Sequence, residues 1–279
     1  MKWMIVADSS CDLKTLETES SDLIYETVPF QMILDGREYE DNEELNVPEM
    51  VDRMETAKSS HSACPAPNSW VEKFMEAEQS IAITISSRLS GSYNSAMAAR
   101  GMVLEQEPDK KIEVIDSLST GPKLVLLAQL AARKIEEKAS FEEVCAACKE
   151  FARTGKTVFT LSSFHNLVQN GRVSKVAGFI AGKLGIRVIG IGTDEGRIHL
   201  KELMRGEKKI LRNLIACMRE DGYQGQPMAI SHCLNLPLAE ELKTLIMDTW
   251  HGAIVQILPT RGLDSYYAER SGLIVSYPV

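Results

Sequence analysis

Short apolar runs alternate with segments of helical periodicity along the whole chain, and this alternation constrains the fold more than any other feature. We expect strands at 3–7, 24–34, 81–85, 112–115, 158–161, 186–191, 228–232, 253–258 and 273–276, and a hairpin partner at 197–203. We expect helices at 47–56, from a cap at Asn68 or Ser69 to 78, from 92 onward, and at 122–138, 141–153, 174–184, 206–219 and 237–250. Asn46 is the expected cap of the first of these helices, and Ser140 with Glu143 forms a capping box for the helix at 141–153. Such alternation predicts an α/β fold with mostly parallel sheets.

Two stretches suggest how the chain is divided. Residues 58–69 contain two prolines and several hydroxyl side chains, which is typical of a loop. Thr154-Gly155-Lys156 resembles a hinge, and the length of 279 residues suits two domains. We therefore predict an N-terminal α/β domain over 1–155 and a C-terminal α/β domain over 156–279.

Composition excludes several classes of function. The net charge of -8 argues against a general nucleic-acid-binding surface. No apolar run reaches the roughly 18 residues that span a bilayer, so we expect no stable membrane insertion. The N-terminal apolar run is too short for a signal peptide, and six cysteines are too few for a disulfide framework in a chain of this length. We expect a cytoplasmic protein.

The richest candidate site is a serine-rich turn that joins a strand to a helix. The apolar run 81–85 is followed by Ser86, Ser87 and Ser90, then by Gly91 and a helical pattern from Ser92. In α/β sheets, ligands bind beyond the carboxyl ends of strands, and a helix N-terminus favours anions. Gly91 allows close approach of the backbone to a ligand. The turn is either an oxyanion cradle or a strand end with a helix cap at Ser90 or Ser92, and the residues alone favour neither.

Other motifs fail in their details. Gly190-Ile-Gly192 follows a predicted strand, but a second predicted strand comes after it. A dinucleotide site requires a helix at that point, so this motif does not qualify. Ser90 lacks the glycine two residues before it that a nucleophile elbow requires. Cys145 and Cys148 are expected to be buried hydrophobes in a helix, and the five histidines show no pair at metal spacing. We therefore predict no metal and no cofactor.

Five segments in the same order resemble the DegV family of bacterial fatty-acid-binding proteins, which include the FakB subunits of fatty acid kinase. The segments are Val6-Ala-Asp-Ser-Ser-Cys-Asp-Leu13, the serine-rich turn from Ser86 to Ala96, Asp116-Ser117, Phe164-His-Asn-Leu-Val-Gln-Asn-Gly-Arg-Val-Ser174, and Arg205-Gly206 with Lys208-Lys209. The resemblance implies a fatty acid buried between two α/β domains, and a protein that binds lipid without catalysing a reaction.

The resemblance also implies which residues bind the carboxylate. A threonine of the family maps to Ser62, and the serine-rich turn maps to Ser86, Ser87, Ser90 and Gly91, with Ser87 as the best match. The family's C-terminal histidine is absent, and Arg261 lies beside the matching position as a cation that could replace it. We expect these six residues to bind the ligand.

In the family, an ATP-dependent kinase subunit phosphorylates the bound fatty acid, and the resemblance assigns the encounter with that subunit to Arg172 and Arg205. The residues alone allow a simpler interpretation. Arg172 would then be a surface side chain at a turn, and Arg205 would be part of a solvated helix face. A second class of function stays open, a serine-dependent esterase or acyl-transfer enzyme that uses Ser87 or Ser90.

Overall fold

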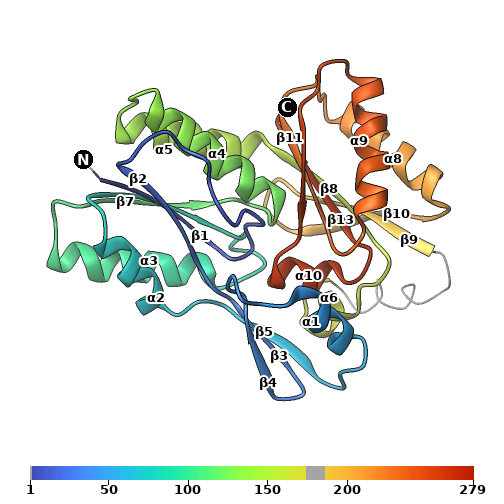
Figure 1. Cartoon of the computed structure of the whole chain (residues 1–279), viewed down its shortest axis with the longest axis horizontal. Helices are drawn as coiled ribbons and strands as arrows, with labels where there is room; N and C mark the ends of the chain where they lie inside the picture. The colour runs from blue at the N-terminus through green and yellow to red at the C-terminus, as the bar shows by residue number, and fades with distance from the viewer. Residues whose placement is uncertain (1, 174–185) are drawn as a thin grey trace.

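The computed structural model describes residues 2–173 and 186–279, and the helix expected over 174–184 lies outside them. Within the described residues the strands form three sheets. The two larger sheets lie side by side along the long axis of the molecule, and the smallest sheet lies below the junction between them (Figure 1). The α/β class is confirmed.

The first sheet is parallel throughout, with the order β2 (Leu23–Val28), β1 (Trp3–Asp8), β6 (Gln79–Thr84), β7 (Lys111–Asp116). Alternate side chains of β1 point to opposite faces. Ile5 packs with α4 (Pro122–Glu136) and α5 (Phe141–Thr154), whereas Val6 packs with α2 (Pro67–Met75) and α3 (Ser92–Gln106). Both faces are therefore buried, as parallel sheets require.

The second sheet is mixed. Its order is β10 (Ile198–Arg205), β9 (Ile186–Gly192), β8 (Lys156–Leu161), β13 (Leu273–Tyr277), β11 (Met228–His232), β12 (Val255–Pro259). Among these described strands, β11 and β12 pair in parallel and the other neighbours pair antiparallel. The expectation of mostly parallel pairing is wrong here, because β9 and β10 form a hairpin and β13 returns antiparallel into the middle of the sheet.

One face of the second sheet is covered by α8 (Glu207–Glu220) and α9 (Leu236–Thr249), which lie near the expected positions. The division at residue 155 coincides with the change from the first sheet to the second. However, α4 packs against both sheets, since Ala229 of β11 belongs to the same core as Leu124. The division into two separate domains therefore stays a prediction.

The turn Asp35-Gly36 predicts a hairpin from the strand before it into Glu38-Tyr39, and this hairpin is part of the smallest sheet, whose separate existence was not expected. This sheet is antiparallel, with the order β4 (Arg37–Glu40), β3 (Gln31–Leu34), β5 (Ser60–Ala63). The strand predicted over 24–34 is divided at Pro29 between two sheets, and the predicted loop 58–69 contains β5, because pairing to β3 satisfies its backbone.

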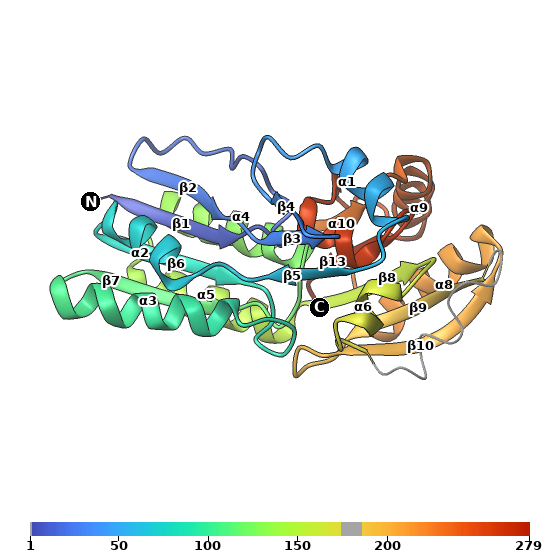
Figure 2. The same ribbon diagram turned by 90° about the horizontal axis from the view of Figure 1, so that it is seen from below.

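Three short helices lie beside this sheet: α1 (Val47–Met54), α6 (His165–Gln169) and α10 (Gly262–Ala268) (Figure 2). Asn46 caps α1 through a 3.2 Å bond from the Glu49 N–H, as expected. The cap expected at Asn68 or Ser69 is wrong, because α2 already begins at Pro67, where the missing N–H costs nothing. No helix in the described ranges combines the length and apolarity that crossing a bilayer demands.

Candidate functional site

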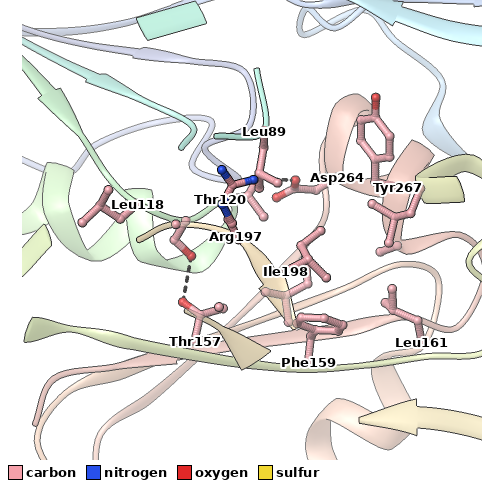
Figure 3. A pocket seen from close by; sticks show the side chains of 16 residues that line it. Leu89, Leu118, Thr120, Thr157, Phe159, Leu161, Arg197, Ile198, Asp264 and Tyr267 are labelled. Carbon is pink, nitrogen blue, oxygen red and sulfur yellow. Dashed lines mark hydrogen bonds between the residues drawn. The ribbon is translucent and has the colours of Figure 1, made fainter. Parts of the chain in front are cut away.

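A cavity lies between the serine-rich turn, the second sheet and α10 (Figure 3). Its wall is mostly apolar, as is typical of small-molecule sites. Alternate residues of β8 form its floor, because Thr157, Phe159 and Leu161 point to the same face of the strand. The remaining wall residues are Leu89, Leu118, Ser119, Thr120, Leu167, Gly192, Gly196, Arg197, Ile198, Asp264, Tyr267, Ala268 and Ile274.

Tyr267, at one end of this mostly apolar wall, bonds a hydroxyl that lies outside the wall. The Oγ of Ser62 and the Oη of Tyr267 are 2.8 Å apart, so they share a hydrogen bond. Tyr267 is a wall residue that the sequence analysis did not identify. It belongs to α10, a helix of seven residues, which is too short to show helical periodicity. The sequence did offer one signal for Tyr267. The Tyr266-Tyr267 pair lies in the segment that lacks the family's histidine, and a tyrosine hydroxyl could have been considered in its place.

A buried aspartate fixes the serine-rich turn at both ends. One oxygen of Asp8 accepts hydrogen bonds from the Ile85 N–H, at 2.9 Å, and from the Ser92 hydroxyl, at 2.6 Å. The other oxygen accepts from the hydroxyl of Ser10 at 2.5 Å. Burial raises the pKa of Asp8 to about 6, and the hydrogen bonds oppose that rise. The end of β6 and the start of α3 are therefore joined through one side chain.

The hydroxyls of the turn have different roles. Ser86 is fully buried, and its Oγ donates to the Gly196 carbonyl at 2.7 Å, so it ties the turn to the β9–β10 hairpin. The backbone N–H of Ser87 bonds the Asp116 carboxylate at 3.2 Å. The Oγ of Ser90 accepts from the Ser92 N–H at 3.3 Å, which is a local cap. These bonds agree with the interpretation as a strand end with a local cap, and the oxyanion cradle stays a prediction.

Gly91 brings the turn close to β5. A Cβ at Gly91 would lie 3.3 Å from the Sγ of Cys64, which follows Ser62 and Ala63 in sequence. The structure therefore brings Ser62 and the Ser90-Gly91 end of the turn to neighbouring places. Leu89, which lies between Ser86 and Ser90 in sequence, is part of the cavity wall.

Arg261 lies away from the cavity wall. Its side chain is 3% exposed, and its guanidinium donates to the Asp41 carbonyl at 2.9 Å and to the Thr27 hydroxyl at 3.3 Å. The Asp41 carboxylate in turn accepts the N–H groups of Gly262 and Leu263 at 2.7 and 2.8 Å. Arg261 and Asp41 together hold the start of α10, which carries Tyr267.

Two further carboxyl groups lie beneath the cavity. Thr120 donates to Asp264 at 2.6 Å, and Asp264 is also part of the wall. A Cβ on Gly121 would lie 2.6 Å from Asp264 Oδ2 and 3.0 Å from Asp12 Oδ2, so the two acids converge. Burial raises the pKa of Asp12 to about 7, and burial with the neighbouring charge of Asp12 raises the pKa of Asp264 well above its usual range. A proton shared between the two acids relieves their repulsion.

The two arginines expected at the partner surface lie in different surroundings. Arg172 is partly buried, and its guanidinium donates to the carbonyl groups of Leu89, at 3.0 Å, and Asn170. It is therefore bonded to the serine-rich turn. Arg205 ends β10 and is exposed, as are Lys208 and Lys209 at the start of α8.

The described residues contain no cluster of three or more side chains suited to bind a metal ion. The hydrogen bonds of Ser86 and Ser90 join backbone groups of the turn and the hairpin. What the arrangement offers chemically is an apolar cavity with a hydroxyl pair at one end.

Comparisons with known proteins agree with this geometry. The family model described as "uncharacterised protein, DegV family" matches residues 2–261. A DegV domain-containing protein of Streptococcus pyogenes serotype M1 is 35% identical over the full length of both chains. The Streptococcus pneumoniae fatty acid kinase B3 protein, solved with linoleic acid, is 36% identical with a TM-score of 0.97 over 100% of both chains. A DegV protein of Eubacterium eligens, solved with heptadecanoic acid, is 38% identical with a TM-score of 0.95 over 99% of both.

Proposed function

This chain belongs to the DegV family, and on that premise we propose that it binds a long-chain fatty acid in the cavity beside β8. The observation that carries the proposal is the combination of an apolar wall with the Ser62–Tyr267 hydroxyl pair at one end. Each methylene that leaves water contributes about 0.8 kcal/mol to binding. Similar proteins solved with linoleic and heptadecanoic acids support the same ligand class.

We propose that the carboxylate binds at the Ser62 end of the cavity. There, the hydroxyl groups of Ser62, Tyr267, Ser87 and Ser90 and the backbone at Gly91 would compensate for the water that the carboxylate loses. Ser86 contributes by fixing the turn, since its Oγ is already bonded to Gly196. Arg261 contributes by holding α10 through Asp41, which keeps Tyr267 in place.

The direct test is to identify what the purified protein carries. Native mass spectrometry followed by organic extraction is expected to find a long-chain fatty acid at one equivalent. Delipidated protein is then titrated with hexadecanoic acid, with hexadecanol as the control of equal chain length that lacks the carboxylate. Absence of any acyl ligand, together with no binding of hexadecanoic acid, would refute the proposal.

We further propose that the protein is a non-catalytic subunit that presents its fatty acid to an ATP-dependent kinase subunit for acyl-phosphate formation. This places it in the cytoplasm, where ATP is available. Arg172 and the exposed Arg205 are the proposed partner contacts, and an arginine fork suits phosphate or a partner carboxylate. The bond from Arg172 to Leu89 would couple partner binding to the turn that lies over the ligand.

Two variants separate partner contact from ligand binding. Arg205→Ala removes an exposed side chain and is expected to reduce phosphoryl transfer by a cognate kinase while fatty acid affinity stays within about twofold, a change small beside one hydrogen bond. Arg172→Ala is expected to reduce transfer as well, with fatty acid affinity nearly intact. Normal transfer in both variants, or a loss of ligand binding in step with transfer, would exclude the partner role.

A further inference from the structure

The end of the cavity opposite Tyr267 includes two hydroxyl side chains, Ser119 and Thr157, in an otherwise mostly apolar wall. Figure 3 shows Leu161 and Tyr267 on one side of the cavity and Leu118 and Thr157 on the other. Thr157 and Leu161 are four residues apart on β8, which corresponds to about 13 Å along a strand. A chain that enters beside Tyr267 and follows β8 therefore ends at the hydroxyls of Ser119 and Thr157. A purely hydrocarbon chain gains nothing from hydroxyl groups at this position.

These hydroxyls form a short chain of hydrogen bonds. The Oγ of Ser119 lies 2.8 Å from the Oγ1 of Thr157, which lies 2.8 Å from the Oγ of Ser276. Three hydroxyls carry three hydrogens, and these two bonds use two of them. If the bonds run from Ser276 toward Ser119, the hydrogen of Ser119 is left at the cavity wall to donate to a ligand oxygen.

A buried lysine lies behind the same end. A second, smaller pocket shares Leu118, Thr157 and Gly192 with the cavity and includes Lys123. Lys123 is 4% exposed, and its Nζ donates to the Ala152 carbonyl at 2.7 Å. Burial lowers the pKa of Lys123 to about 8, and nearby Lys156 adds to this effect. The charges of Asp194 and Asp116 oppose this lowering, so charges of both signs lie behind this end of the cavity.

We propose that the cavity accepts hydroxylated long-chain acids, whose distal hydroxyl binds Ser119 and Thr157. This inference rests on the proposed function, because it assumes that the carboxylate lies at the Ser62 end. The ligand hydroxyl accepts from the Ser119–Thr157–Ser276 chain and replaces its bonds to water with bonds to these side chains. The protein would thus discriminate acids by a distal oxygen as well as by chain length.

The experiment compares octadecanoic acid with hydroxyoctadecanoic acids that carry the hydroxyl on the tenth, twelfth or terminal carbon. Affinities are measured by titration of delipidated full-length protein. At least one hydroxy acid is expected to bind as tightly as octadecanoic acid or more tightly. In Thr157→Val, the affinity for that hydroxy acid relative to octadecanoic acid is expected to fall about tenfold, the effect of one lost hydrogen bond.

Thr160→Val is the matched control. Thr160 is a fully buried threonine of the same strand that points to the face opposite Thr157, so the same substitution there should leave the affinity ratio unchanged. The inference is overturned if every hydroxy acid binds more than about tenfold more weakly than octadecanoic acid, or if Thr157→Val and Thr160→Val have equal ratios. Failure of octadecanoic acid itself to bind would instead refute the proposed function.

Discussion

At the scale of single residues, the proposed head-group end of the cavity has a tyrosine where the family resemblance suggested a histidine or an arginine. Tyr267 reaches the cavity and bonds Ser62, whereas Arg261 is occupied by Asp41. The Tyr267 hydroxyl can donate one hydrogen bond to a ligand oxygen.

The first prediction concerns the Tyr267 hydroxyl. Tyr267→Phe is expected to weaken fatty acid binding by about 1.5–3 kcal/mol, because it removes a hydrogen bond to a charged group. Tyr266→Phe is the matched control, since the Tyr266 hydroxyl bonds Ser60 and Asn170, outside the cavity wall. Titration with hexadecanoic acid checks the difference. Equal affinity losses in the two variants would contradict the assignment.

The second prediction concerns the pH dependence of folding. The pKa of Asp8 is about 6 in the folded protein, compared with an ordinary value of 3.8. Folding therefore favours the protonated carboxyl group. Its contribution to the free energy of unfolding is fully present below pH 3.8 and is lost as the pH rises through 6. This loss amounts to about 3 kcal/mol. Asp8→Asn cannot ionise and should remove that part of the change between about pH 4 and pH 7. Urea unfolding of both proteins measures it, and parallel pH profiles would show that Asp8 does not carry the effect.

At the scale of elements, the cavity is closed by contact between two turns. The β9–β10 hairpin meets the serine-rich turn where Ser86 donates to Gly196. Gly196 has a φ of 79°, and a Cβ there would lie 2.3 Å from the Ser86 Oγ. Glycine is therefore required at position 196 for two reasons: the positive φ of the backbone and the close approach of the Ser86 side chain.

The third prediction uses this contact. Gly196→Ala is expected to displace the hairpin from the turn and weaken fatty acid binding about tenfold or more, the equivalent of one lost hydrogen bond. Gly206→Ala controls for backbone strain, because Gly206 has a φ of 89° but no atom lies within 4 Å of the position that a Cβ would occupy. Backbone strain should cost both variants about 1–3 kcal/mol of stability, and Gly196→Ala should lose more because of the close approach to Ser86. If both lose ligand affinity to the same extent, the contact between the turns is not what closes the cavity.

The sequence predicted most of the longer elements, because a buried strand and an amphipathic helix each leave a repeating pattern. It also identified the serine-rich turn, and Asn46 and Ser140 cap helices as expected. It did not predict β5 or α10, because four and seven residues carry too little periodicity. Nor could local patterns reveal that Arg261 meets Asp41, a contact between residues 220 positions apart.

At the scale of the whole molecule, the cavity is built from both larger sheets and α10, so a ligand would link parts of the chain that are distant in sequence. The wall includes Leu89 before α3, Thr157 on β8 and Tyr267 on α10. A ligand that binds the folded protein and not the unfolded chain stabilises the fold by mass action.

The fourth prediction follows from that linkage. Hexadecanoic acid at a free concentration of about 100 times its Kd should stabilise the protein by about 2.7 kcal/mol, which corresponds to a Tm rise of about 5 °C or more. Hexadecanol at the same concentration should give a smaller rise, because it lacks the carboxylate. Thermal unfolding monitored by circular dichroism measures both, and equal rises would show that the carboxylate is not recognised.

The position of β13 has a consequence for how the protein is made. This strand follows the other described strands of its sheet in sequence, yet it lies in the centre of that sheet, between β8 and β11. A ribosome releases the N-terminal part first, so β8 and β11 each keep an open edge until residues 273–277 emerge. Such edges pair readily with other chains. A nascent chain stalled before Leu273 should therefore aggregate or recruit chaperones, while the first sheet, complete by Asp116, can already be folded on the ribosome.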